Sequence, residues 1–310
     1  MLSARFDKPP LVSIGIPTFN RARLLHTAIE NAREQTYSNL EIIISDNAST
    51  DPEVESLCRR AEQEDTRIKY FRQPHNIGPT ANFEFTLLNS SGKFFAWFAD
   101  DDLHTPTYVE KLLHAYSGAS RQTALICFEA QYITEVGAFT FFPEAEAFYG
   151  GLRGEAVERM STTIRCGPGN IIYGLFRREA LFHNNAPITR WIGPTLNELP
   201  FFALVAFAGE ILCLPEIGLW KRAPLKVCQA ARWERAGGLN PNGPGLNIPG
   251  LIKYHWRVLK ELDQVFNVID VPERDRRILR QDTMRGLAKH ALACIAGWKP
   301  ARKAGIAAPT

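Results

Sequence analysis

Between residues 11 and 128 the chain alternates short apolar runs with longer segments whose apolar residues recur at helical spacing. The short runs predict strands at residues 11–16, 40–44, 68–71, 93–98 and 124–128, and the first two are predicted to be buried. The segments between them predict helices at residues 23–35, 51–64, 78–91 and 105–116. Strands that alternate with helices form βαβ units. We therefore expect an α/β fold with a mostly parallel central sheet flanked by helices.

The alternation fades from about residue 139. Residues 237–250 are rich in Gly, Pro and Asn, which predicts a flexible loop or linker. Two amphipathic helices are expected after it, at residues 251–266 and 274–296. The chain is thus expected to comprise one α/β domain at residues 1–236 and a C-terminal helical extension at residues 251–310.

Composition excludes several classes of protein. The 310 residues are 45% hydrophobic and 22% charged, so a disordered or collagenous chain is excluded. The net charge is only +3, which gives no indication of a nucleic-acid partner. The six cysteines lack metal-binding or redox spacing, and we interpret them as reduced thiols of a cytoplasmic protein. The apolar run at residues 199–209 is too short to span a membrane, so we expect a buried helix there.

The residues that follow each predicted strand are the candidates for chemistry, because ligands bind beyond the carboxyl ends of parallel strands. These positions hold Pro17, Thr18, Phe19 and Arg21 after the first strand, Asp46 after the second, and Asp100, Asp101 and Asp102 after the fourth. For Phe19 the alternative interpretation is core packing, and for Asp46 it is an Asx-type turn.

Three adjacent carboxylates after a buried strand repel one another unless a cation lies between them. A divalent Mg²⁺ or Mn²⁺ ion, with open positions for a diphosphate, would remove that cost. The alternative is a solvated turn in which Asp102 caps the next helix. Glycine-rich phosphate-binding motifs are absent from the sequence, which favours phosphates held by the metal.

Taken together, several segments make the sequence resemble the family 2 glycosyltransferases with the Rossmann-like GT-A fold. The segments are residues 12–21, 35–51, 76–93 and 98–102, followed by Pro106. The resemblance covers residues 11 to about 115. It implies a nucleotide-sugar donor bound by residues 1–128 and an acceptor bound by residues 129–236.

The resemblance also implies roles for individual residues. Phe19 would contact the base, Asp46 would hydrogen-bond its edge, Asp100 would lie near the ribose, Asp101 would bind the metal, and Asp102 would orient the site or share the ion. Pro17, Thr18, Arg21 and Asn76 would complete the donor site. The sequence departs from the family's acidic DXD-type motif at its first position, where it has Ala99.

A second motif is identified by counting back from Gly209 and from the Leu-Pro-Glu segment at residues 214–216. The resemblance then places Glu198 where the family's catalytic base lies, which is normally Asp. The alternative is an acid that stabilises a helix N-terminus. Lys221 and Arg222 follow the next strand and would meet the donor diphosphate, or would lie at a solvated strand end.

The function implied is inverting transfer of a sugar to a hydroxyl of a glycan or lipid-linked acceptor. By analogy this belongs to bacterial surface polysaccharide synthesis, that is O-antigen, capsule or exopolysaccharide. Two alternatives stay open. One is a non-catalytic nucleotide-sugar-binding protein. The other is a haloacid-dehalogenase-like phosphatase, whose motif residues 100–104 imitate except at His104.

The C-terminal segment is strongly basic, with nine basic and two acidic residues between positions 274 and 303. Apolar residues recur at roughly helical spacing on it, at Leu279, Leu287, Leu292, Ile295 and Trp298. This pattern predicts an anchor that lies in the plane of an anionic membrane, on the inner face of the plasma membrane. The alternative is a helix that packs on the catalytic domain.

Overall fold

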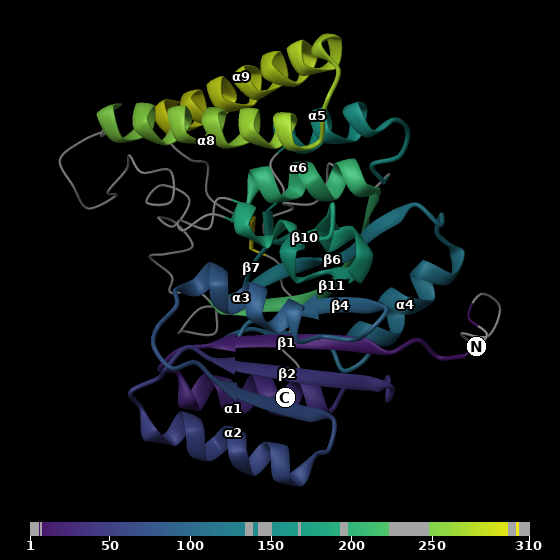
Figure 1. The fold of residues 1–310 in the computed structure, drawn as a ribbon, viewed down its shortest axis with the longest axis vertical. Helices are drawn as coiled ribbons and strands as arrows, with labels where there is room; N and C mark the ends of the chain where they lie inside the picture. Colours follow the sequence, from purple (N-terminus) through teal and green to yellow (C-terminus); the bar gives the residue numbers. More distant parts are fainter. Residues whose placement is uncertain are drawn as a thin grey trace.

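The computed structural model describes residue 6 and residues 8–133, 139–141, 151–166, 169–192, 198–222, 248–296 and 302–303. Four parallel strands lie side by side in the order β4-β1-β2-β3, namely β1 (Val12–Thr18), β2 (Leu40–Asp46), β3 (Ile68–Arg72) and β4 (Phe94–Trp97). Helices α1 (Ala22–Arg33), α2 (Pro52–Glu64), α3 (Pro79–Leu88) and α4 (Tyr108–Gly118) alternate with the strands along the chain. The predicted α/β fold with a mostly parallel sheet is confirmed (Figure 1).

The sheet continues beyond β4 through strands from the second half of the chain. These are β6 (Thr123–Ile133), β7 (Phe139–Phe141), β8 (Leu175–Arg177), β11 (Glu210–Arg222) and β12 (Arg302–Lys303). The short β8 runs antiparallel between β4 and β6, and β11 runs parallel to β6. The two-residue β5 (Leu103–His104) pairs with β11. This last pairing brings the acidic segment that precedes β5 beside the end of β11.

Side chains alternate across the sheet, which separates the core into two layers. On β4, Phe95 and Trp97 point to one layer and Phe94 and Ala96 to the other. Helices α1, α2 and α4 cover the second layer. The first is covered by α3, α5 (Ala156–Cys166), α6 (Leu199–Ala208) and the C-terminal helices. The expected buried helix at residues 199–209 is confirmed, because every side chain from Pro200 to Ala206 in α6 is buried.

Short elements connect the larger ones in the second half. They are η2 (Gly169–Tyr173), η3 (Arg178–Leu181), β9 (Phe182–His183), β10 (Ala186–Pro187) and η4 (Ile188–Ile192). Strands β9 and β10 form a separate two-stranded sheet. Within the described ranges, none of the helices has the length and apolar content needed to cross a membrane.

The C-terminal helices α8 (Ile248–Val268) and α9 (Glu273–Ala296) lie at one end of the molecule, where α8 packs on α6 and α9 on α5 (Figure 1). Helix α8 begins three residues before the expected position, and residues 237–247 of the expected linker lie outside the described residues. Leu279 and Leu287 on α9 are buried in the core. The expected membrane-facing role of these two leucines is therefore wrong, because their face packs on the domain. The side chains of Leu292, Ile295 and Trp298 lie outside the described part.

Glu41 on β2 forms a buried polar centre remote from the site edge. Its carboxylate accepts hydrogen bonds from the Ser13 hydroxyl (2.6 Å) and the Gly92 N–H (3.1 Å), and Lys69 donates to it at 3.0 Å. Burial alone would raise the pKa of Glu41, but the bonds from Ser13, Ser91 and Lys69 outweigh it and lower the pKa to about 2. The ionised form therefore stabilises the fold.

We expect Glu41→Gln to lower the free energy of unfolding at pH 7 by about 3 kcal/mol, since each pKa unit is worth about 1.4 kcal/mol. Because the folded-state pKa is lowered, this contribution is present above about pH 4.5 and is lost as the pH falls toward 2. Urea denaturation at pH 7 and near pH 3 measures it, with exposed Glu34→Gln as the control. A loss that does not depend on pH would contradict the assignment.

Candidate functional site

The carboxyl ends of β1, β2 and β4 meet at one edge of the sheet. Thr18, the last residue of β1, is paired in register with Asp46, the last residue of β2. The Thr18 hydroxyl donates a 2.8 Å hydrogen bond to Asp100 Oδ2 in the turn after β4. The structure thus brings together segments that are far apart in the sequence, at the edge where ligands of parallel sheets bind.

Arg21 bridges two of the three acids that follow β4. Its Nη1 lies 2.9 Å from Asp100 Oδ1 and 2.8 Å from Asp101 Oδ2. Burial raises the pKa of Asp100, although Arg21 and the Thr18 hydroxyl favour its ionised form. Half of the Arg21 side chain is exposed, so its guanidinium also presents positive charge at the open side of the acidic turn.

Asp102 is the most deeply buried of the three acids. Its Oδ1 accepts a hydrogen bond from the Arg222 backbone N–H at 3.1 Å. Its Oδ2 is buried and has no hydrogen-bond donor among the described residues; the Lys221 ammonium lies 3.5 Å away. Burial raises the pKa of Asp102 to about 6, with the Lys221 charge opposing the rise. The alternative role of Asp102 as a helix cap is wrong, because Thr107 occupies the N-cap of α4.

Lys221 is held in place by an aromatic ring as well as by Asp102. Its Nζ lies 4.1 Å from the centroid of the Tyr173 ring, a cation–π contact. Burial alone would lower the pKa of Lys221. The charges of Asp102, Tyr173 and Glu198 raise it by more than burial lowers it, so the ammonium stays charged. Tyr173 is in turn anchored by the Tyr108 hydroxyl, which donates to its carbonyl oxygen at 2.7 Å.

Glu198 lies at the start of α6, within electrostatic range of Lys221. It occupies the N-cap position, but its side chain makes no capping hydrogen bond there. Its charge raises the pKa of both Lys221 and Tyr173, which places its carboxylate in their electrostatic neighbourhood. Asp102, in the turn after β4, and Lys221, on β11, thus form a charged pair within electrostatic range of Glu198 at the start of α6. The role of Glu198 as a base stays a prediction.

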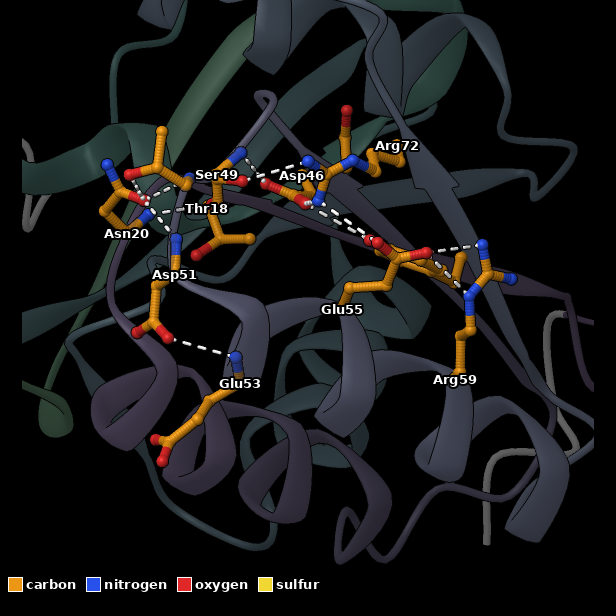
Figure 2. A network of polar contacts seen from close by, with 12 residues as sticks. Thr18, Asn20, Asp46, Ser49, Asp51, Glu53, Glu55, Arg59 and Arg72 are labelled. Carbon is orange, nitrogen blue, oxygen red and sulfur yellow. Dashed lines mark hydrogen bonds and ion pairs between the residues drawn. The ribbon is translucent and has the colours of Figure 1, made fainter.

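The Asp46 carboxylate lies at the other end of the site and is fully buried. It accepts hydrogen bonds from the Ser49 N–H (2.8 Å), the Tyr70 hydroxyl (3.1 Å) and Arg72 (3.2 Å). Figure 2 shows Arg72 between Asp46 and Glu55, whose carboxylate lies 3.4 Å from the guanidinium. The Ser49 contact is a local side-chain-to-backbone bond, so a turn role of Asp46, the alternative interpretation, is present in the structure. The bonds hold Asp46 at the floor of this end of the site.

Phe19, by contrast, is 39% exposed. The core-packing alternative for Phe19 is therefore wrong. An exposed aromatic ring directly after the end of β1 is a surface on which a flat heterocycle can stack.

Two further predicted site residues support the loops. Asn76 Oδ1 accepts hydrogen bonds from the Asn47 side chain and the Gly78 N–H, both at 2.9 Å. Pro17 is buried within β1, opposite Ser45. Both side chains therefore shape the strand ends.

The site opens beside Arg222 into a cavity of about 470 Å³. The cavity is lined by Arg23, Leu24, Thr27 and Arg222. Because the Arg222 backbone is bonded to Asp102, this space adjoins the acidic turn. Two guanidinium groups beside the acidic turn give a region suited to anions.

The acidic turn fits a divalent cation of the kind that binds together with a phosphate ligand. In the described residues no three acidic, His or Cys side chains gather as a metal-binding set. Mg²⁺ and Mn²⁺, however, are commonly held by one or two carboxylates plus phosphate oxygens of the substrate. The buried Asp102 Oδ2, which lacks a hydrogen-bond donor, and the partly exposed Asp101 provide such a pair.

Three residues of this site were missed from the sequence. Arg72 is the last residue of β3. Its position at a strand end is the same signal that identifies Asp46 and Asp100. Tyr70 lies two residues before Arg72 on the same strand. Tyr173 belongs to an irregular segment without periodicity, and nothing in its sequence context indicates the contact with Lys221.

Comparison with known proteins gives a consistent picture. A profile of the family described as Glycosyl transferase family 2 matches residues 13–171. A Campylobacter jejuni protein, GalNAc(5)-diNAcBac-PP-undecaprenol beta-1,3-glucosyltransferase, is 40% identical over 94 residues, which cover 30% of each chain. An uncharacterized glycosyltransferase of Rickettsia bellii is 32% identical over 133 residues, or 43% of this chain and 19% of that protein. The matched region thus spans less than a third of either relative.

Solved structures show the same fold over most of the chain. The mannosyltransferase PcManGT from Pyrobaculum calidifontis, in complex with GDP-Man and Mn²⁺, has a TM-score of 0.52 and 16% identity. The match covers 93% of this chain and 88% of the mannosyltransferase chain. Staphylococcus aureus TarS 1-349, in complex with UDP-GlcNAc, has a TM-score of 0.52 and 12% identity over 92% of this chain and 90% of its own. At these identities the likeness concerns the fold.

Proposed function

Because the chain belongs to glycosyl transferase family 2, we propose that it transfers a sugar from a nucleotide-sugar donor to a hydroxyl of a glycan or lipid-linked acceptor, with inversion. The observation that carries the proposal is the arrangement at the sheet edge. There the exposed Phe19 and the acidic turn follow the ends of the neighbouring strands β1 and β4, and Glu198 at the start of α6 lies within electrostatic range of Lys221, the partner of Asp102. In a nucleotide-sugar transferase the aromatic ring serves the base, the acidic turn serves the diphosphate through a cation, and the carboxylate serves the reacting sugar.

The donor would be held along the strand ends. Phe19 stacks on the base and Asp100 lies near the ribose. The Asp46 carboxylate is fully buried on Ser49, Tyr70 and Arg72, so its part is to hold the loop beneath the base. Arg21, Lys221 and Arg222 supply positive charge for the diphosphate. Thr18, Pro17 and Asn76 keep these loops in position. The donor half of the domain then corresponds to residues 1–128 and the acceptor half to residues 129–236.

The transfer itself needs a base and a stabilised leaving group. Glu198 accepts the proton of the acceptor hydroxyl, and the oxygen forms a bond to the anomeric carbon. The bond from that carbon to the diphosphate oxygen breaks on the opposite face, so the configuration inverts. Lys221 is charged at working pH and lies beside Asp102, where negative charge develops on the leaving diphosphate.

Asp101 and Asp102 would hold a Mn²⁺ or Mg²⁺ ion, which supplies positive charge to the diphosphate when it is bound. The mannosyltransferase with the same fold contains Mn²⁺ together with its nucleotide-sugar, which supports this assignment.

The acceptor class is supported by the Campylobacter relative, whose name specifies a glycan linked through diphosphate to undecaprenol. We propose an acceptor of that chemistry for this chain. The reaction would then serve bacterial surface polysaccharide synthesis, in the cytoplasm at the inner face of the plasma membrane. The two arginines of the cavity beside the acidic turn would suit an acceptor that carries phosphate.

Acceptor-dependent release of a nucleoside diphosphate from a nucleotide-sugar tests this function. Release that requires an acceptor hydroxyl, with one glycosylated product, is the expected result. Donor binding without any release would indicate a non-catalytic binding protein. Release of phosphate from simple phosphoesters without an acceptor would indicate a phosphatase.

The buried pair of Asp102 and Lys221 predicts a specific pH dependence. We expect turnover to fall as the pH drops through about 6, because protonated Asp102 no longer binds the cation. The Lys221 charge lowers the pKa of Asp102, so Lys221→Gln should move this acidic limb to higher pH. The pH profile of kcat/KM measures the shift. Lys111→Gln, which breaks only an exposed ion pair with Glu216, is the control and should leave the limb in place.

A further inference from the structure

Exposed large hydrophobic side chains gather on the two C-terminal helices. On α8, Trp256 is 61% and Ile252 53% exposed, and on α9, Met284 is 55% and Ile278 41% exposed. Elsewhere in the described residues such exposure is found only at Phe19, in the donor site, and at Leu88 on α3. An exposed tryptophan with several apolar neighbours marks an interaction surface.

Two polar contacts fix the register of these helices. Arg280 on α9 pairs with Asp263 on α8 at 2.6 Å, and Arg276 donates to Asn267 at 2.5 Å. The later residue on α9, Arg280, contacts the earlier residue on α8, Asp263, so the two helices are antiparallel.

The register brings the apolar residues of the two helices together. Ile252 and Trp256 precede Asp263 by eleven and seven residues, which places all three on one helical stripe. Met284 follows Arg280 by one turn. The Arg280–Asp263 pair therefore sets the two stripes side by side, with Met284 within about one turn of Trp256.

The same face carries positive charge. Lys253 and Lys260 flank Trp256 at three residues before and four after, the positions adjacent to it on a helix. No acidic side chain of the described ranges forms an ion pair with either lysine, nor with Arg274. Long lysine side chains beside a tryptophan can extend their ammonium groups toward lipid headgroups while the ring enters the boundary below them.

The opposite faces of both helices are already used. Val258, Leu262 and Val265 on α8 and Leu279 and Leu287 on α9 are buried in the core. The helices close one end of the molecule, opposite α1 and α2 (Figure 1). The outward stripes therefore project from an end of the molecule, where a flat surface can reach them.

We propose that this outer face of α8 and α9, formed by Ile252, Lys253, Trp256, Lys260 and Met284, docks on the surface of an anionic lipid membrane. The helices lie in the plane of the headgroups, with the apolar side chains inserted and the lysines on anionic lipids. Charge complementarity selects the occupant, because the exposed tryptophan lies between Lys253 and Lys260, two lysines without an acidic partner among the described residues, and this arrangement matches the boundary of an anionic bilayer. The contacting face differs from the leucine face predicted from the sequence. The proposal does not depend on the transfer reaction.

Sedimentation of the full chain with vesicles tests this contact. We expect binding to vesicles of phosphatidylcholine mixed with phosphatidylglycerol, weaker binding at high salt, and little binding to phosphatidylcholine alone. Trp256→Ser should weaken binding to the anionic vesicles by about tenfold or more. Leu88→Ser removes a comparably exposed side chain on α3 and should bind as the wild type does.

A second pair of variants tests the charge. The double replacement of Lys253 and Lys260 by Glu should abolish the salt-sensitive part of the binding, whereas Arg60→Glu on α2, at the other end of the molecule, should not. Wild-type binding by both Trp256→Ser and the double variant would overturn the proposal. So would equal binding of the wild type to neutral vesicles. An oligomer that Trp256→Ser dissociates without any change in lipid binding would instead identify the face as an interface between copies.

Discussion

Replacing Glu198 with Gln should lower kcat by a factor of about 10² to 10⁴, the usual contribution of a positioned general base. Donor affinity should stay unchanged, because the residue is expected to contact the acceptor hydroxyl and its amide keeps the same shape. The amide of Gln is nearly the same size as the carboxylate it replaces, so the fold should tolerate the change. Steady-state kinetics with saturating donor, together with donor titration, separate the two effects.

The matched control for this replacement is Glu179→Gln, since Glu179 is a largely exposed acid on η3. It should leave kcat unchanged. Normal turnover by Glu198→Gln would contradict the assigned base. Equal losses in kcat and donor affinity would show that Glu198 acts on the donor.

Replacing Asp102 with Asn should have two separable consequences. Removal of the carboxylate should reduce metal-dependent kcat/KM by about 10² or more, because the diphosphate loses the charge of the ion. It should also destabilise the fold by about 3 kcal/mol, because the buried Lys221 ammonium then lacks its counter-charge. Kinetics with titrated Mn²⁺ and urea denaturation measure the two effects.

A second replacement distinguishes them. Combining Asp102→Asn with Lys221→Gln removes both charges, so it should recover much of the lost stability and none of the metal-dependent activity. Recovery of both would show that Asp102 serves only to neutralise Lys221. Full activity of Asp102→Asn at low Mn²⁺ would contradict its role at the metal.

The parallel half of the fold could be predicted because its signals are local. Strands β1, β2 and β4 are short runs rich in apolar residues, and α2 begins with Asp51 at its N-cap and Pro52 in its first turn. The second half could not be predicted in this way. Strand β11 contains Pro215 and register shifts near Leu214 and Ile217, which interrupt its alternation. Strand β8 is three residues long, too short for a periodic pattern.

The same division applies to the candidate site. Thr18, Asp46 and Asp100 were predicted because each lies at a strand end, and the structure joins them. The contact of Lys221 with Tyr173 depends on the pairing of β11 with β5 and β6, which no local pattern encodes. The face of Leu279 and Leu287 was assigned to a membrane because an apolar helical stripe looks the same whether lipid or a protein core covers it.

The most direct test of the proposed donor site is thermal unfolding of the chain with a panel of nucleoside diphosphates and nucleotide-sugars, with and without Mn²⁺. We expect one class of nucleotide to raise the Tm, and to do so only when Mn²⁺ is present. That result would identify the base of the donor and support a site built on Phe19, Asp101 and Asp102. The absence of any shift, under conditions where a nucleotide-sugar transferase of known activity responds, would contradict it.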